Sequence, residues 1–289
     1  RTRATACGRC RASGRRGKPD LPPVAVIQAR MGSTRLPGKV LRPILGKPML
    51  WHIVRRLKCV PGLLDAVVAT SDQPGDEPIR GFCRENAIPC FAGSERDVLD
   101  RFYRAAKRFG GDPLIRITGD CPFVDPVLVG KLLERFRGGG YDHVAVATGA
   151  GALFLEGGRY PDGLDAECFS FSSLERAWRE ATEESDREHV TPYIWRNKSL
   201  FRCGHLTSER DYSDLRWTVD NEEDFGLVER IYEALYSEER PFSMNDILAY
   251  LSGHPELSSA NRGFIGKEGY RELWKLERDA NPPDKGKKP

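Results

Sequence analysis

Apolar runs rich in β-branched residues alternate with amphipathic segments along the first half of the chain. These runs predict strands at 24–29, 65–71, 89–93, 113–120 and 142–148. The segments between them have apolar residues at helical spacing and predict helices at 48–58, 78–87, 97–110 and 126–137. Continuous apolar strands separated by helices are typical of a mostly parallel sheet that is buried on both faces. We therefore expect an α/β, Rossmann-like fold with helices on both faces of the sheet.

The second half of the chain has a looser pattern. Residues 151–170 predict a hairpin or a loop crossing, and later apolar runs predict strands at 200–206 and 215–220. Helices are predicted at 171–181, 186–197, 222–236 and 243–254, the second of them kinked or delayed by Pro192. We expect one domain over 23–254 with an accessory lobe at about 150–205. A partly disordered C-terminal extension follows over 255–289.

The composition is ordinary for a globular protein, with 39% hydrophobic and 30% charged residues. No apolar run reaches the roughly 20 residues that a membrane helix needs, and no signal peptide is recognisable, so we expect a cytoplasmic protein without a membrane partner. The net charge of +3 is uneven. Residues 1–20 carry seven basic residues and one acidic residue, which leaves −3 on the rest of the chain. We expect 1–22 to be a disordered basic tail and the body to bind no nucleic acid.

The loop after the first predicted strand, QARMGSTRLPGK at 28–39, combines two glycines with Arg30, Arg35 and Lys39. Glycine lets a backbone approach a ligand closely, and backbone N–H groups in such a loop can face an anion. Charge-assisted hydrogen bonds contribute about 1.5–3 kcal/mol each, so three cations suit a triphosphate or its departing pyrophosphate. The loop is neither GxGxxG nor a Walker A motif, since Val40 follows the lysine. A basic surface turn is the alternative.

Two acidic residues end predicted strands. Asp120 ends RITGD at 116–120, and Asp220 ends WTVD at 217–220. The carboxyl ends of parallel strands lie at one edge of a sheet, where ligands bind. Two carboxylates there suit Mg²⁺, which completes its coordination with water and phosphate oxygens. For the neighbouring acids we predict helix-capping roles instead, as for Asp97 at the start of the predicted helix at 97–110: Asp125, Glu222, Glu223 and Asp224.

Together these motifs resemble the cytidylyltransferases that make CMP-activated acid sugars, a family that includes the CMP-Kdo synthetases and the acylneuraminate cytidylyltransferases. The likeness runs from about 24 to 250 and looks strongest to the spore-coat polysaccharide branch. It rests on three segments: QARMGSTRLPGKVLRPILGKPML resembles the family's phosphate loop, GDCP its GDxP segment and TVDNEED its later acidic segment. The resemblance implies a nucleotide-diphospho-sugar transferase fold, with 23–254 as a nucleotidyltransferase domain.

The resemblance also implies roles for individual residues. Arg30 and Lys39 are the main phosphate contacts and, with Asp120 and Asp220, the expected catalytic residues. Asp120 and Asp220 are the expected ligands of Mg²⁺. The expected nucleotide contacts are Gln28, Ala29, Arg30, Met31, Gly32, Ser33, Arg35, Lys39, Ser71, Asp72, Thr118 and Gly119. Related enzymes are often homodimers, so we keep a homodimer as an expectation, although the chain gives no interface signal.

Two segments of the second half are expected on the acceptor side. YPDGLDAECFS at 160–170 and SDREHVTPY at 185–193 resemble blocks of the spore-coat branch that the CMP-Kdo enzymes lack in this form. We predict that they line a sugar pocket in which Arg187 binds the carboxylate of an acid sugar. The residues concerned are Asp162, Asp165, Glu167, Arg187, Glu188 and His189. A solvated acidic strand face and a helix-terminal ion pair are the alternatives.

The expected reaction is transfer of CMP from CTP to the hydroxyl of a sialic-acid-like or Kdo-like sugar, with release of pyrophosphate, for cell-surface or spore-coat polysaccharide synthesis. Positioning and charge neutralisation carry most of such catalysis. One alternative is a nucleotidyltransferase that acts on a sugar or polyol phosphate. Another is a nucleic-acid-binding protein that uses the basic tail, with strongly salt-dependent binding. A third is a scaffold without activity.

Overall fold

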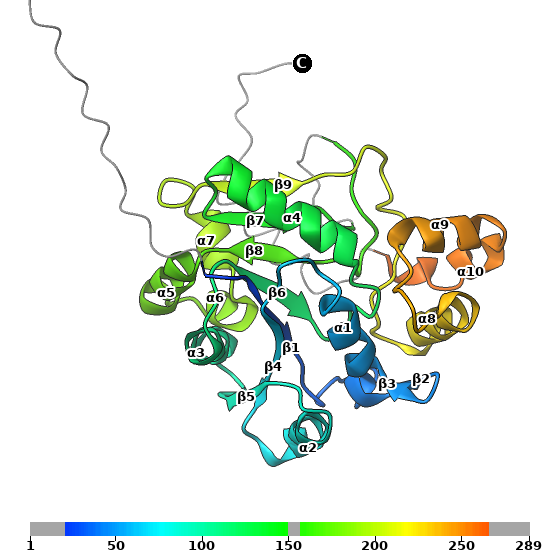
Figure 1. The fold of residues 1–289 in the computed structure, drawn as a ribbon, viewed down its shortest axis with the longest axis horizontal. Helices are drawn as coiled ribbons and strands as arrows, with labels where there is room; N and C mark the ends of the chain where they lie inside the picture. Colours follow the sequence, from blue (N-terminus) through cyan, green and yellow to red (C-terminus); the bar gives the residue numbers. More distant parts are fainter. Residues whose placement is uncertain (1–20, 150–156, 266–289) are drawn as a thin grey trace, which may run out of the picture.

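The computed structural model describes residues 21–149 and 157–265 (Figure 1). The predicted basic tail at 1–22 lies almost wholly outside the described residues, and so does most of the predicted extension at 255–289. Within the described part of the chain, no helix is long and apolar enough to cross a membrane.

The centre of the molecule is a seven-stranded sheet with the order β5-β4-β1-β6-β8-β7-β9. Its strands are β1 (Val24–Gln28), β4 (Asp65–Ser71), β5 (Cys90–Gly93), β6 (Leu114–Thr118), β7 (His143–Val146), β8 (Glu167–Phe169) and β9 (Cys203–Leu206). All neighbours are parallel except at β8, which runs antiparallel to β6 and to β7. The expectation of a mostly parallel sheet is confirmed. A short hairpin of β2 (Pro43–Ile44) and β3 (Lys47–Pro48) stands apart from it.

Helices cover both faces of the sheet (Figure 1). The helices of the described residues are α1 (Met49–Leu57), α2 (Glu77–Glu85), α3 (Val98–Phe109), α4 (Pro126–Gly139), α5 (Phe171–Glu180), α6 (Glu184–His189), α7 (Pro192–Arg196), α8 (Glu222–Leu235), α9 (Met244–Ser252) and α10 (Pro255–Ser259). Three short 3-10 helices also lie in the described part of the chain: η1 (Lys39–Leu41), η2 (Pro74–Asp76) and η3 (Arg262–Phe264). Figure 1 shows α8, α9 and α10 together at one end of the molecule.

Side-chain alternation along the strands creates two hydrophobic cores. Ala25 and Ile27 of β1 face a core that α1 and α4 cover, whereas Val24 and Val26 face a second core that α3 and α5 cover. All four side chains are fully buried. Successive residues of a strand point to opposite faces, so a continuous apolar run fits only a strand that is covered on both sides. This is why the sequence pattern predicts the sheet well.

The predicted helix caps are partly confirmed. The carboxylate of Asp97 accepts a hydrogen bond from the N–H of Asp100 at the start of α3. Asp125 caps α4 in the same way. For α8 the cap prediction was wrong, because the Asn221 side chain caps the helix and Asp224 is buried in an ion pair with Arg216.

The predicted strand at 215–220 is wrong. The segment is extended but forms only an isolated bridge between Asp162 and Arg216. The N–H of Trp217 donates to Asp162 O, and the N–H of Val219 donates to Asp120 O. The segment therefore runs past the carboxyl end of β6 and bonds to loops there, instead of joining the sheet.

The predicted helix at 186–197 is divided into α6 and α7, and Pro192 is the first residue of α7. Proline is favoured there because the first turn of a helix leaves its N–H unused. Between the two helices, buried Val190 has φ 73°, and the N–H of Thr191 donates to His189 O. A tight turn of this kind is strained at a β-branched residue. The segment expected to form an accessory lobe, at about 150–205, supplies β8 and β9 to the central sheet.

Candidate active site

The loop over 28–39 is folded tightly against the carboxyl ends of β1 and β4. Gly38 has φ 72°, a value that favours glycine, and its N–H donates to Met31 O at 3.1 Å. The carboxylate of Asp76 accepts hydrogen bonds from the N–H of Met31 at 2.6 Å and from the N–H of Ser71 at 3.2 Å. Asp76 therefore ties the loop to the end of β4, a role that the sequence analysis did not give it.

The end of β6 lies directly beside the end of β1. The N–H of Gly119 donates to Gln28 O at 2.8 Å, and a Cβ atom on Gly119 would lie only 2.9 Å from that oxygen. A larger residue would push the two strand ends apart. Glycine therefore lets Asp120 follow β6 at a position next to the loop.

Lys39, at the end of the loop, connects the two acids expected to bind a metal. Its Nζ donates to Asp120 Oδ2 at 3.0 Å, to Asp220 Oδ1 at 2.9 Å and to Val219 O at 2.7 Å. Burial by itself would lower the pKa of Lys39, but the two carboxylates raise it. Burial likewise opposes a charge on Asp120, yet the Lys39 ammonium holds its pKa below the usual value. Lys39 and Asp120 are therefore both charged at neutral pH.

Asp220 is also held by two arginines. The guanidinium of Arg35 lies 3.1 Å from Asp220 Oδ2, and Nη2 of Arg216 donates to the same oxygen at 2.7 Å. The Arg216 side chain is only 2% exposed and donates in addition to Asp162 Oδ2 at 2.9 Å and to both carboxylate oxygens of Asp224 at 3.0 Å. The structure thus brings Asp120 and Asp220 together through Lys39, while Arg35 of the same loop and Arg216 from a distant segment hold Asp220.

Asp165 lies close enough to Asp120 to respond to its charge. It accepts hydrogen bonds from the hydroxyl of Thr148 and from the N–H of Gly163. Burial raises the pKa of Asp165, and the nearby negative charges of Asp120 and Glu167 raise it further. A residue predicted for the acceptor side therefore lies next to the predicted metal site.

A row of polar side chains crosses the sheet near its carboxyl edge. Arg116 of β6 donates to Gln28 Oε1 at the end of β1 and to Glu167 Oε2 at the start of β8. Oε1 of Glu167 lies 3.0 Å from His143 Nε2 and accepts the hydroxyl of Thr191 at 2.8 Å. Burial opposes a charge on Glu167, but Arg116 and these hydrogen bonds lower its pKa to about 2. The row links a predicted nucleotide contact to a predicted acceptor contact.

Replacing Glu167 with glutamine is expected to lower the free energy of unfolding at pH 7 by about 3 kcal/mol, because buried Arg116 loses a charged partner. The native pKa lies below the ordinary value of 4.5, so the carboxylate stabilises the protein above that pH and loses this effect as the pH falls toward about 2. Urea unfolding at about pH 7 and pH 4 should therefore show a larger difference from the parent at pH 7. The control is the exposed Glu223→Gln, and an equal effect of both changes would contradict the prediction.

The remaining residues predicted for the acceptor lie in and beside α6. The guanidinium of Arg187 donates to both carboxylate oxygens of Asp97, at 3.0 and 2.5 Å, and to Trp178 O at 2.8 Å. Glu188 is exposed. His189 is half-buried; burial lowers its pKa, and it lies close enough to Arg116 and Glu167 to respond to their charges. A role for Arg187 in binding a sugar requires that its pair with Asp97 opens.

The other predicted nucleotide contacts follow the same edge of the sheet. Some lie at strand ends and some in the loop: Gln28, Ser71, Asp72, Thr118 and Gly119 at the ends of β1, β4 and β6, and Ala29, Arg30, Met31, Gly32, Ser33 and Arg35 in the loop. Buried Arg101 of α3 was missed. It donates to Ser94 O at 2.6 Å, and its pKa is lowered by burial and, more weakly, by the charge of Arg30. The position of Arg101 adds a cation to this edge of the sheet.

The chemistry of the site fits a hard cation. Within 21–149 and 157–265, no group of three or more His, Cys, Asp or Glu side chains is arranged to hold a metal. Asp120 and Asp220 each place one oxygen within 3.0 Å of the same ammonium, so a positive charge already lies between the two carboxylates. Mg²⁺ commonly takes only one or two protein carboxylates and fills its other positions with water and phosphate oxygens. The pair therefore fits Mg²⁺ that arrives with a nucleotide.

The sequence profile of the cytidylyltransferase family matches residues 24–247, which is most of the chain. The chain belongs to this family. It is therefore an enzyme, a nucleotidyltransferase that uses CTP, and the resemblance noted in the sequence is confirmed.

The similarity to known proteins agrees with this family assignment. The chain is 32% identical to the spore coat polysaccharide biosynthesis protein SpsF of Bacillus subtilis over 81% of this chain and 95% of that protein. A solved cytidylyltransferase from Leptospira borgpetersenii has a TM-score of 0.73 at 29% identity, covering 82% of this chain and 97% of that one. A solved CMP:2-keto-3-deoxy-manno-octonic acid synthetase in complex with CTP has a TM-score of 0.55 at 20% identity, covering 74% and 99%. The nucleotidyltransferase fold is confirmed.

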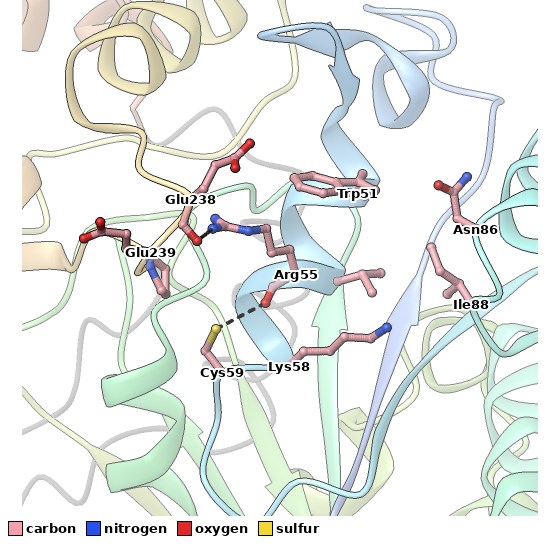
Figure 2. Close-up of a pocket in the computed structure, with 10 residues that line it drawn as sticks. Trp51, Arg55, Lys58, Cys59, Asn86, Ile88, Glu238 and Glu239 are labelled. Atoms are coloured by element: carbon pink, nitrogen blue, oxygen red, sulfur yellow. Dashed lines mark hydrogen bonds between the residues drawn. The ribbon is translucent and has the colours of Figure 1, made fainter.

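A separate groove of about 400 Å³ lies on the outer side of α1 (Figure 2). Its lining comes from α1, the turn before β5 and the segment between α8 and α9, and includes Trp51, Arg55, Lys58, Cys59, Ile88 and Glu238. Arg55 donates to the backbone oxygens of Ser237 and Glu238 there, at 2.9 and 2.6 Å. None of the predicted site residues lines this groove.

The arginines that organise the site of the cytidylyltransferase were not predicted from the sequence. Arg116 stands within the apolar strand LIRIT, and Arg216 stands within the apolar segment LRWTV. A charged residue inside a buried strand is rare unless it is paired. The sequence contains this signal. It does not show the partners of these arginines, which lie as many as 88 positions away.

Proposed function

We propose that this cytidylyltransferase transfers CMP from CTP to a hydroxyl of an acid sugar and releases pyrophosphate. The observation that carries the proposal is the position of Lys39, which lies at the end of a phosphate-type loop and between two carboxylates. The named activity of one structural neighbour, a CMP:2-keto-3-deoxy-manno-octonic acid synthetase, supports an acid sugar as acceptor. The name of the Bacillus subtilis relative, a spore coat polysaccharide biosynthesis protein, supports polysaccharide synthesis as the purpose.

The backbone of 28–39 and the cations Arg30, Arg35 and Lys39 would bind the triphosphate and compensate its charge. Asp120 and Asp220 would hold Mg²⁺, which supplies charge neutralisation for the phosphates. A sugar oxygen forms a bond to the α-phosphorus as the bond from that phosphorus to the β-phosphate oxygen breaks. The hydroxyl proton passes to solvent water, and pyrophosphate leaves. The chain's own contribution is to align these groups and to stabilise the charge that moves onto the leaving group.

The acceptor would bind across the carboxyl edge, between the phosphate loop and α6. Asp162, Asp165, Glu167, Glu188 and His189 are proposed to surround it. Most of these residues are acidic and suit sugar hydroxyl groups. Arg187 is proposed to meet the sugar carboxylate after leaving Asp97. A phosphate on the acceptor would bring more negative charge than a carboxylate into this mainly acidic group. The charge of the group therefore favours an acid sugar over a sugar phosphate.

The test is pyrophosphate release with each of the four nucleoside triphosphates, Mg²⁺ and a panel of 2-keto-3-deoxy acid sugars and sugar phosphates. We expect release only with CTP and an acid sugar, and none after chelation of the metal. Release with sugar phosphates alone would overturn the proposed acceptor and leave the CTP site in place. Release that persists in excess chelator would overturn the proposed metal.

A further inference from the structure

A segment beyond the part matched by the family profile reaches the back of the candidate metal site. The profile ends at residue 247, whereas the chain continues through α10, which packs against α9, to η3 and Phe264 (Figure 1). Asn261 lies between α10 and η3 and is only 2% exposed. A buried amide needs partners for its polar atoms, so its contacts show what the segment does.

Both hydrogen bonds that the Asn261 amide donates end on the segment that carries Asp220. Nδ2 of Asn261 donates to Asp224 Oδ1 at 2.8 Å and to Arg216 O at 2.9 Å. An amide nitrogen has two hydrogens, so these two bonds use its full donor capacity. The side chain thus clamps the two ends of 216–224 from outside the sheet.

Asp224 connects this clamp to Arg216 and to the backbone of Asp220. Its side chain is fully buried and accepts from Nε and Nη2 of Arg216, both at 3.0 Å, and from the N–H of Asp220 at 2.9 Å. A carboxylate without exposure is stable only when such donors surround it. Asn261 supplies one of these donors, so its loss loosens the group that orients both Arg216 and Asp220.

Arg216 passes the restraint to the side chain of Asp220. Its Nη2 donates to Asp220 Oδ2 at 2.7 Å, while the other oxygen of Asp220 accepts from Lys39. Among the described residues, Arg216 pairs with the carboxylates of Asp162, Asp220 and Asp224, and of these Asp220 also pairs with Lys39. Partners that orient a metal-binding carboxylate typically change metal affinity or activity by 10–100-fold when they are removed.

We infer that Asn261 and Arg216 are positioning residues for Asp220, and that the C-terminal segment at 255–264 is part of the metal site's support. The inference rests on the proposed function, in which Asp220 binds Mg²⁺ with CTP. It assigns a role in the reaction to a segment that the family profile does not cover.

The test measures Mn²⁺ binding to the full chain in the presence of CTP by electron paramagnetic resonance, with Tm as a check on folding. Asn261→Ala removes both donors, and Asn261→Asp keeps the volume but replaces the donor with an acceptor next to Asp224. We expect both variants to weaken Mn²⁺ binding at least about tenfold. The Mg²⁺ concentration that gives half-maximal turnover should rise by a similar factor, while the KM for the acceptor stays unchanged. Asn261→Ala, which buries no second carboxylate beside Asp224, serves if Asn261→Asp fails to fold.

The matched control is Arg262→Ala, whose side chain is 55% exposed and lies 3.8 Å from exposed Asp214. It disturbs the same segment without touching Asp224 and should leave Mn²⁺ binding unchanged. Equal Mn²⁺ affinity in the parent and in both Asn261 variants would overturn the inference, and so would an equal loss in Arg262→Ala. Absence of Mn²⁺ binding by the parent would overturn the proposed metal site, and this inference with it.

Discussion

Replacement of Asp120 by asparagine is expected to lower kcat/KM at least about 100-fold. Removing one group that stabilises charge in a preorganised site typically costs that much. Asparagine keeps the size of the side chain and can still accept from Lys39, but it supplies no negative charge to a bound cation. The expected signature is a loss in kcat that added Mg²⁺ restores only in part. Steady-state kinetics with CTP and varied Mg²⁺ measure it.

The control for this change is Asp214→Asn, a substitution of the same kind at a side chain that is 70% exposed. It should leave kcat and the Mg²⁺ dependence unchanged. The Tm of Asp120→Asn should stay within a few degrees of the parent, since Lys39 keeps its bonds to Asp220 and Val219. Full activity in Asp120→Asn would contradict the assignment of this carboxylate to the reaction.

Replacement of Lys39 by methionine is expected to have two opposite effects. Turnover should fall at least about 100-fold, because the triphosphate loses a buried cation. Divalent-metal binding without nucleotide should become at least about tenfold tighter, because the ammonium no longer competes for Asp120 and Asp220. Two unit charges about 4 Å apart interact by about 4 kcal/mol at an effective dielectric of 20, which is more than enough for a tenfold change.

Mn²⁺ titration of the nucleotide-free protein, followed by electron paramagnetic resonance, separates the two effects from simple damage. Lys47→Met is the matched control, since Lys47 is exposed and lies over the ring of Trp51. A disrupted site would lose both turnover and Mn²⁺ affinity. Removal of an ammonium that competes with the metal would lower turnover and raise Mn²⁺ affinity. Unchanged or weaker Mn²⁺ binding in Lys39→Met would show that Lys39 does not occupy the place of the metal.

Most of the sheet and its helices follow from the sequence pattern alone. The strands at 24–28 and 65–71 have consecutive apolar residues, which point to both faces of the sheet. Only a sheet that is covered on both sides can bury them. The loop after the first strand and Asp120 after a later one are local features, so their position at one edge of the sheet could be predicted from the order of the elements.

The tertiary structure alone decided how the charges are paired. The extended segment at 215–220 reads as a strand, but its N–H groups bond to loops, and only this placement brings Asp220 to Lys39. The antiparallel insertion of β8 between β6 and β7 sets Glu167 opposite Arg116. Local periodicity carries no information about partners that are tens or hundreds of positions apart. The sequence by itself thus determined which chemical groups lie at the edge, and the fold determined which of them touch.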